Sequence, residues 1–367
     1  MTGSHFEPVR TVFDRLVAER PGAGLALSVY YRGEHVVDLC GDPEYTGDSL
    51  QLVFSVTKGL TAICTALLID RGQLDPDAPV AAYWPEFGAA GKDAIPVRSL
   101  LSHQAGLPTV DSGFTLAEAL DGEELAARLA AQRPYWEPGT RHGYHSLTFG
   151  TLAGELIRRV TGRSLGEFFS AEVADPLGAD AWIGLPASQD HRYVPLVPPP
   201  GPSERPGEGS LLSRSFPRDF DIDTCNKRFV RAASQGAFTA VASARGLSRL
   251  YAACIGPVGG IRLLSERTVT LVATPEADGD DLVNLEPSRF GLGFQVPFAR
   301  LPLAGPGSFG HDGMGGALAF ASPRDQLAFA FVTDRMPAIG GADPCTAELV
   351  GAVTACARAV RGRSNIS

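Results

Sequence analysis

The chain has 367 residues, of which 44% are hydrophobic and 20% are charged, and its formal net charge is -9 at pH 7. This length and apolar content are enough for a large buried core divided into about two lobes. The acidic balance argues against binding to nucleic acid or to an anionic membrane surface, because both require clustered Lys and Arg.

The start of the chain shows no export signal. Residues 1–16 contain no apolar stretch, and no run approaches the roughly 18 apolar residues of a membrane-spanning helix. Six cysteines are scattered without a Cys-x-x-Cys pair, and several fall in helix or strand patterns, where a thiol packs as a small hydrophobe. We therefore expect a reduced, cytoplasmic protein.

Strand and helix patterns follow one another in the first 72 residues. Residues 25–31 and 34–40 are rich in β-formers and are joined by Arg32-Gly33, a two-residue connection typical of a hairpin. Residues 57–71 carry apolar side chains at helical spacing, and Gly72 ends the pattern. The sequence predicts a hairpin and then a helix with one buried face.

The middle of the chain reads as helical. Residues 116–131 and 147–160 are the clearest helical stretches, and Gly162 caps the second. Residues 193–217 contain seven prolines, too many for regular structure, and predict a long surface loop. A further helix is expected at about 241–254.

Strand patterns return near the end, at residues 291–297, 316–321 and 326–333, before a last helix at about 344–360. Sheet at both ends of a helical middle predicts an α/β (α+β) fold. In it, residues 1–70 and 290–367 form one mixed lobe, and residues 71–289 form an inserted, mainly helical lobe. An active site is expected between the lobes.

Lys58 is one of only three lysines among 32 basic residues, and it stands three residues after Ser55. Ser55 precedes the first turn of the predicted helix, where free N–H groups favour negative charge, and Lys58 lies one turn later on the same face. A lysine amine in this position can deprotonate the serine hydroxyl for attack on a carbonyl carbon. A cation near a helix start is otherwise unfavourable, which favours a functional role.

Two further segments can complete a site. Tyr144 and Ser146 precede the helix predicted from residue 147 and can point a phenol and a hydroxyl into a cleft. A tyrosine packed under the loop is an equally good interpretation. Residues 310–316 are rich in glycine, which lets a ligand approach the backbone and leaves N–H groups free to donate, although a plain turn also fits.

Taken in order, these segments resemble the three motifs of the class C β-lactamase and penicillin-binding-protein superfamily of serine hydrolases. The motifs are Ser-x-x-Lys, Tyr-x-Asn or Tyr-x-Ser, and Lys-Thr-Gly or His-x-Gly. Here they run from Ser55 to Lys58, from Tyr144 to Ser146 and from His311 to Gly313. Residues 96–108 and 136–150 also look like that family, and the Tyr-His-Ser variant is similar to the family VIII carboxylesterases. The resemblance implies a β-lactamase/transpeptidase-like fold, with an antiparallel sheet flanked by helices.

The resemblance also implies roles for single residues. Ser55 is the nucleophile, Lys58 takes or relays its proton, and Tyr144 is the partner base and the acid for the leaving group. Which of Lys58 and Tyr144 is the base stays open, since the pair can titrate as a unit. The backbone N–H groups of Ser55 and Met314 form the oxyanion hole. The substrate-binding residues implied are Ser146, where the family often has asparagine, and His311, Gly313 and Gly315.

The third motif departs from that of the lactamases. His311 replaces a lysine and is largely neutral at pH 7, and Asp312 beside it adds negative charge. Anionic substrates are therefore disfavoured. We expect a small-molecule partner, an uncharged ester or acyl compound, without cofactor or metal; the oligomeric state is not predicted.

Three other patterns are interpreted as structural. Residues 162–166 match the Gly-x-Ser-x-Gly elbow of α/β-hydrolases, but a strand should precede that turn and here a helix does. Ser164 instead predicts a helix N-cap, with Glu167 completing a capping box. His142 and His145 lack a second pair of ligands at zinc spacing, and His103 is interpreted as structural.

Three functions stay open. The leading hypothesis is ester hydrolysis through an acyl-Ser55 intermediate. The second is transfer of the acyl group to an alcohol or amine in natural-product metabolism, which differs only in whether water reaches the acyl-enzyme. The third is a non-catalytic binding module with the same fold. A β-lactamase or D-Ala-D-Ala peptidase is less favoured.

Overall fold

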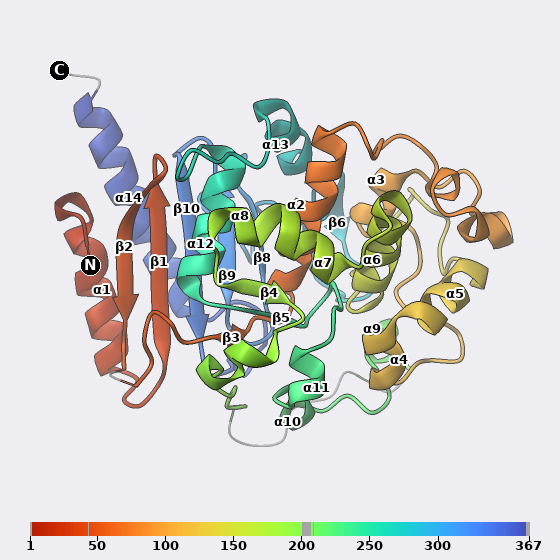
Figure 1. The fold of residues 1–367 in the computed structure, drawn as a ribbon, viewed down its shortest axis with the longest axis horizontal. Helices are drawn as coiled ribbons and strands as arrows, with labels where there is room; N and C mark the ends of the chain where they lie inside the picture. Colours follow the sequence, from red (N-terminus) through yellow and green to blue (C-terminus); the bar gives the residue numbers. More distant parts are fainter. Residues whose placement is uncertain (1, 43, 200–206, 208, 365–367) are drawn as a thin grey trace.

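A five-stranded antiparallel sheet forms the centre of the computed structural model, which describes residues 2–42, 44–199, 207 and 209–364. The strand order is β2-β1-β10-β9-β8, so the N-terminal hairpin pairs with strands from the end of the chain (Figure 1). This arrangement confirms the predicted mixed fold. The strands are β1 (Leu25–Tyr31), β2 (Glu34–Cys40), β8 (Phe309–Asp312), β9 (Leu318–Ser322) and β10 (Leu327–Thr333).

The first hairpin has the bounds that its pattern predicts. Arg32 and Gly33 both have positive φ, 51° and 79°, which matches the twist of the two flanking strands. Strand β1 is buried along its whole length, whereas β2 at the sheet edge is only partly buried. Complete burial on both faces explains the nearly continuous apolar run in β1.

Helices cover both faces of the sheet, and the side chains alternate accordingly. Large side chains such as Phe329 and Phe331 face a cluster with α1 (Glu7–Ala18) and α14 (Cys345–Ser364). Small side chains such as Ala328 and Ala330 face the other cluster, where α12 (Ala244–Ile255) packs against β1, β9 and β10. Figure 1 shows α12 over the sheet, although its residues fall in the segment expected to form the helical lobe. The division at residues 70 and 290 stays a prediction.

The remaining helices gather beside α2 (Val56–Asp70), as Figure 1 shows. They include α3 (Val97–Leu101), α4 (Leu116–Asp121), α5 (Glu123–Ala131), α6 (Thr148–Thr161) and α7 (Leu165–Phe169). The single helix predicted over residues 116–131 is wrong, because Gly122 has φ 81° and ends α4 before α5 begins. Ser164 caps α7 in a capping box with Glu167, as predicted.

Three other expectations need correction. Residues 291–297 do not form a strand, because Gly293 has φ 83° and turns the chain; the strand here is β7 (Pro287–Phe290), paired with β6 (Ala277–Asp280). His311 lies within strand β8 and not in a loop ahead of a strand. The proline-rich segment 193–217 includes a short helix, α9 (Leu211–Arg214), while its residues 200–206 and 208 lie outside the described residues.

A second, three-stranded sheet stands beside the start of α2, in the order β3-β5-β4. Its strands are β3 (Gln51–Leu52), β4 (Ala181–Ile183) and β5 (Ala240–Ala242). Because β5 uses residues 240–242 and Ser243 then caps α12, the helix expected from residue 241 begins at residue 244. Short elements complete the chain: η1 (Ser4–Phe6), η2 (Val80–Ala82), η3 (Pro85–Gly91), η4 (Ser170–Ala174), α8 (Asp175–Leu177), η5 (Ala187–Arg192), α10 (Ile222–Cys225), α11 (Arg228–Arg231) and α13 (Glu266–Ala273).

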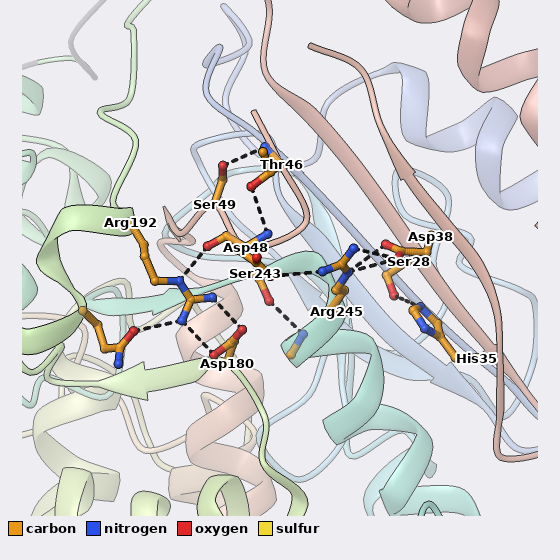
Figure 2. Close-up of polar contacts among 12 residues, drawn as sticks. Ser28, His35, Asp38, Thr46, Asp48, Ser49, Asp180, Arg192, Ser243 and Arg245 are labelled. Carbon is orange, nitrogen blue, oxygen red and sulfur yellow. Dashed lines mark hydrogen bonds and ion pairs between the residues drawn. The ribbon is translucent and has the colours of Figure 1, made fainter. Parts of the chain in front are cut away.

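An ion-pair network holds the segment that leads into β3 and α2 (Figure 2). The Arg245 guanidinium on α12 donates to the carboxylates of Asp38, at 2.9 Å, and Asp48, at 3.1 Å. Arg192 donates to the Asp180 carboxylate at 2.6 Å and to the Asp48 carbonyl at 2.8 Å. Strand β2, helix α12 and the residues flanking β4 therefore all support the loop around Asp48.

None of the helices in the described ranges has both the length and the apolar character needed to cross a bilayer.

Candidate active site

Ser55 stands at the N-terminus of α2 on a sharp turn. Phe54 before it has φ 44°, a left-handed conformation that is uncommon for a residue with a side chain. One turn into the helix, the Lys58 Nζ atom lies 3.1 Å from Ser55 Oγ and 3.1 Å from the carbonyl oxygen of Ala237. The structure thus brings together the hydroxyl and the amine that their spacing predicts to be neighbours.

Lys58 is completely buried, with 0% of its surface exposed. Burial holds its pKa well below the usual lysine range, and the negative charge of Asp312 opposes this shift only in part. The Lys58 Nζ atom also lies over the Tyr144 ring, 4.7 Å from its centroid. An amine with a lowered pKa next to a hydroxyl can accept the hydroxyl proton near neutral pH.

Tyr144 reaches the same place from the loop ahead of α6. Its ring stacks on Phe290 at a centroid separation of 6.0 Å. Burial raises the pKa of the phenol above its usual value, and an interaction with the Ser55 side chain partly offsets the shift. The phenol therefore keeps its proton near neutral pH and faces the pair formed by Ser55 and Lys58.

Two backbone N–H groups are free beside Ser55. In the described part of the chain, the N–H groups of Ser55 and Met314 have no hydrogen-bond acceptor, whereas Gly316 N donates to Gly313 O at 2.9 Å. A Cβ atom on Gly313 would lie 2.2 Å from the carbonyl oxygen of Val53, so only glycine lets this turn pack against the backbone before Ser55. The two N–H groups can stabilise a developing oxyanion.

The other three predicted substrate-binding residues have contacts of their own. Ser146 Oγ bonds to Ser215 Oγ at 2.9 Å, and among the described residues Lys58 donates to Ser55 and Ala237 rather than to Ser146. Gly315 packs against the Phe54 ring. His311 is fully buried and donates from Nδ1 to the carbonyl oxygen of Asp312 at 2.7 Å, and burial lowers its pKa to about 4. A substrate contact by the His311 side chain stays a prediction.

A cavity of about 1320 Å³ opens at Ser55, and Tyr144, Ser146 and Met314 also line it. Its walls are predominantly apolar, with prolines, leucines and six phenylalanines: Phe54, Phe216, Phe220, Phe238, Phe290 and Phe298. A cavity of this size and lining suits a small molecule with a substantial apolar part.

Arg300 in the cavity wall is a residue that the sequence did not single out. It donates to the Asp312 carboxylate at 2.9 Å and sits over the Phe298 ring. Burial on its own would raise the pKa of Asp312, but the Arg300 charge and hydrogen bond keep that pKa below its usual value. The negative charge assigned to the third motif is therefore neutralised by a neighbour, which corrects the argument that Asp312 repels anionic substrates.

The histidines considered as metal ligands have other partners. His142 Nε2 bonds to Ser288 Oγ at 2.9 Å. His145 accepts from the Leu107 N–H at 2.9 Å and bonds to the Gly143 carbonyl oxygen at 2.7 Å. Over the described residues, no group of three or more His, Cys, Asp or Glu side chains is arranged to hold a metal ion.

Several known proteins are similar to this chain in sequence and fold. The model of a family described as Beta-lactamase matches residues 9–352. The Esterase/beta-lactamase LipL of Mycobacterium tuberculosis (strain ATCC 25618 / H37Rv) is 36% identical over 355 residues, which cover 90% of this chain and 81% of LipL. The solved structure of EstA from Arthrobacter nitroguajacolicus Rue61a is 37% identical with a TM-score of 0.93 and covers 98% of each chain. A family VIII carboxylesterase is 35% identical with a TM-score of 0.88, covering 97% of this chain and 98% of its own.

Proposed function

Because the chain belongs to the beta-lactamase family and is a serine hydrolase of that family, we propose that it hydrolyses carboxylic esters of uncharged small molecules through an acyl-Ser55 intermediate. The observation that carries the proposal is the desolvated Lys58 amine, 3.1 Å from Ser55 Oγ at the opening of an apolar cavity. The partner is then a small-molecule ester.

In the acylation step, Lys58 accepts the Ser55 proton while Oγ forms a bond to the ester carbonyl carbon. The carbonyl oxygen becomes an oxyanion that accepts hydrogen bonds from the N–H groups of Ser55 and Met314. When the carbon–oxygen bond to the alcohol breaks, the leaving alkoxide takes a proton from Tyr144, which recovers one from Lys58. The products of this step are the free alcohol and the acyl-Ser55 ester.

The assignment of base and acid rests on opposite pKa shifts. The pKa of Lys58 is lowered and that of Tyr144 is raised, both chiefly by burial. Near neutral pH the amine is therefore present without its extra proton and can accept one, while the phenol still carries the proton that it can give to the leaving group. In deacylation, a water molecule gives a proton to Lys58 as its oxygen bonds to the acyl carbon. The bond from that carbon to Ser55 Oγ then breaks, Oγ recovers the proton from Lys58, and the carboxylic acid leaves.

The cavity and two relatives support an uncharged ester as the substrate. Apolar side chains form most of the cavity lining, and they favour an apolar acyl group or alcohol. LipL carries the name Esterase/beta-lactamase, and a solved relative is described as a family VIII carboxylesterase.

Acyl transfer to an alcohol or amine is the second candidate. The cavity, at about 1320 Å³, exceeds the roughly 300 to 1,000 Å³ typical of small-molecule sites, so it has room for an acceptor beside a bound acyl group. Adding candidate alcohols or amines to the ester assay and weighing the products distinguishes the two reactions. A hydrolase releases the free acid at an unchanged rate, whereas a transferase forms the new ester or amide.

Labelling with a serine-directed fluorophosphonate, together with hydrolysis of p-nitrophenyl butyrate, tests the proposal. We expect labelling and burst kinetics in the wild type and loss of both in Ser55→Ala, because acylation and deacylation are separate steps. Ser164→Ala is the matched control, since Ser164 caps helix α7 and should leave the labelling unchanged. A wild-type protein that neither labels nor hydrolyses esters would show that the proposal is wrong.

We also propose a cytoplasmic location. Five of the six cysteines are buried in the packed interior as free thiols, and a reducing compartment would keep them in that form. Ester hydrolysis measured in the fractions of the native host tests this location, with the cytoplasmic fraction compared with the membrane pellet and the external medium.

A further inference from the structure

The peptide groups around Tyr144 are held from two directions. Gly143 N donates to the carbonyl oxygen of His103 at 3.1 Å, and His145 N donates to Nδ1 of the same histidine at 3.1 Å. Between them, Tyr144 N donates to both oxygens of the Asp281 carboxylate, at 3.0 and 3.1 Å. Three consecutive N–H groups are thus fixed by two residues, and one of these, His103, holds both ends.

His103 makes both bonds while its backbone is in an unusual conformation. Its φ is 64°, in the left-handed region that residues with a side chain adopt at a cost and keep only where their surroundings enforce it. The side chain is completely buried, and its ring lies 5.2 Å from the Tyr144 ring and 4.4 Å from the Phe290 ring. The ring thus packs against the phenol whose loop it holds.

The hydrogen bonds also determine the protonation state of the ring. Since Nδ1 accepts the N–H of His145, the neutral ring carries its proton on Nε2, which has no partner within the described residues. A second proton on Nδ1 would break the bond to His145. Burial, followed by the charges of His145, Lys58, His311 and His142, holds the pKa of His103 well below its usual value, so the accepting form persists.

We propose that His103 is a positioning residue for the reaction, whose carbonyl oxygen and Nδ1 together set the Tyr144 phenol in register with Ser55 and Lys58. The inference rests on the proposed function, in which the phenol protonates the leaving group. His103 lies in the segment 96–108, whose sequence carries no nucleophile or base of the proposed mechanism.

The expected signature is a loss of kcat with little change in KM. A displaced phenol slows proton transfer to the leaving alkoxide, because a displacement of about 1 Å can cost roughly 100-fold in rate. The apolar walls that bind the ester contain no atom of His103, so ground-state binding is retained. A residue needed only for folding would instead change the amount of active enzyme and leave kcat per active site unaltered.

Two substitutions separate the acceptor from the ring. The assay uses an alkyl ester such as ethyl butyrate, because its alkoxide leaving group needs a proton whereas p-nitrophenolate leaves without one. His103→Asn tolerates the left-handed conformation and places an amide oxygen where Nδ1 accepts, so kcat for this ester should stay within about 3-fold of the wild type. His103→Phe keeps a ring but loses the acceptor, so kcat should fall by about 10- to 100-fold with KM within about 3-fold. Titration of active sites with the fluorophosphonate corrects both values for misfolded protein.

If His103→Phe does not fold, His103→Gln replaces it, because the longer side chain places its amide near the Nε2 position and leaves Nδ1 without an equivalent. The inference is overturned if the variant without the acceptor keeps wild-type kcat, or if His103→Asn loses as much activity as that variant does. A wild type that labels but hydrolyses no ester would contradict the proposed function alone, and the labelling rates of the same variants would then decide the role of His103.

Discussion

Two lysines, Lys58 in the candidate active site and Lys92 in the helical part of the chain, are both shielded from solvent but have different surroundings. Both side chains are 0% exposed. The Lys92 Nζ atom donates to three backbone carbonyl oxygens, those of Ala89 at 2.7 Å, Ala130 at 2.8 Å and Gln132 at 2.6 Å. Lys58 donates to one carbonyl oxygen and to the Ser55 hydroxyl.

This difference shows that burial of a lysine does not by itself indicate catalysis. An ammonium has three N–H donors, and around Lys92 all three meet fixed backbone acceptors. Around Lys58 one acceptor is a hydroxyl that can give up its proton, and the phenol ring lies close by. Burial lowers the pKa of Lys92 to about 8 and that of Lys58 well below its usual range. We infer that the set of acceptors, in addition to the depth of burial, separates a structural lysine from a reactive one.

Replacing each lysine by methionine gives the largest expected contrast. Lys58→Met should lower kcat for p-nitrophenyl butyrate by at least about 10³-fold, because it removes the proton acceptor and keeps the volume. Lys92→Met should leave kcat per folded molecule within about 3-fold of the wild type. Steady-state rates divided by the folded fraction from circular dichroism measure this contrast, and a fully active Lys58→Met would show that the proton route is wrong.

The same two variants should reverse their order in stability. Lys92→Met leaves three carbonyl oxygens without their donor, one of them in the buried residue Ala130, and should lower the free energy of unfolding by about 3 kcal/mol. Lys58→Met removes a desolvated amine, which offsets the loss of the donor to the Ala237 carbonyl oxygen, so the free energy of unfolding should fall by less than in Lys92→Met. Urea unfolding followed by fluorescence measures both values. Equal losses in the two variants would contradict the contrast between the two lysines.

The pH dependence of ester hydrolysis should report Lys58. Its pKa is lowered by burial, so the proton-accepting form is lost only as the pH falls through this lowered pKa. Below that pKa, kcat/KM should fall by about tenfold per pH unit. The raised pKa of Tyr144 keeps the phenol protonated, so no alkaline decline is expected below about pH 10. A profile of kcat/KM from pH 5 to 10, recorded beside the same profile of Ser146→Ala, measures both limbs of the pH dependence. An alkaline decline centred well below pH 10 would contradict the assignment of the Tyr144 phenol as the acid.

The smallest effect is expected at an exposed cation with several partners. Arg245 pairs with Asp38 and Asp48, yet its side chain is 42% exposed. Arg245→Met should change the free energy of unfolding by less than about 1 kcal/mol and kcat by less than about 2-fold, because water screens exposed ion pairs. The urea and ester assays used for the lysine variants measure both quantities. If Arg245→Met lowered the free energy of unfolding as much as Lys92→Met does, the ion-pair network in Figure 2 would support the Ser55 turn more strongly than the exposure of Arg245 indicates.

Local pattern was sufficient for much of the fold. The bounds of β1 and β2, the turn at Arg32-Gly33 and the helix that carries Ser55 and Lys58 all depend on neighbours within a few residues. Sheet patterns at both ends of the chain also indicated one sheet built from both. The errors arose where a glycine changed the backbone direction inside an apolar run, as at Gly122 and Gly293.

The sequence by itself determined the contact between Ser55 and Lys58, because one helical turn brings residues three apart to the same face. Only the tertiary structure decided the rest of the site. The carbonyl oxygen that accepts from Lys58 belongs to Ala237, 179 positions away, and the two carbonyl oxygens of Ala130 and Gln132 that bind Lys92 lie 38 and 40 positions away. The pKa of a lysine and the place of a phenol depend on which distant groups pack around them, and spacing along the chain carries no record of that packing.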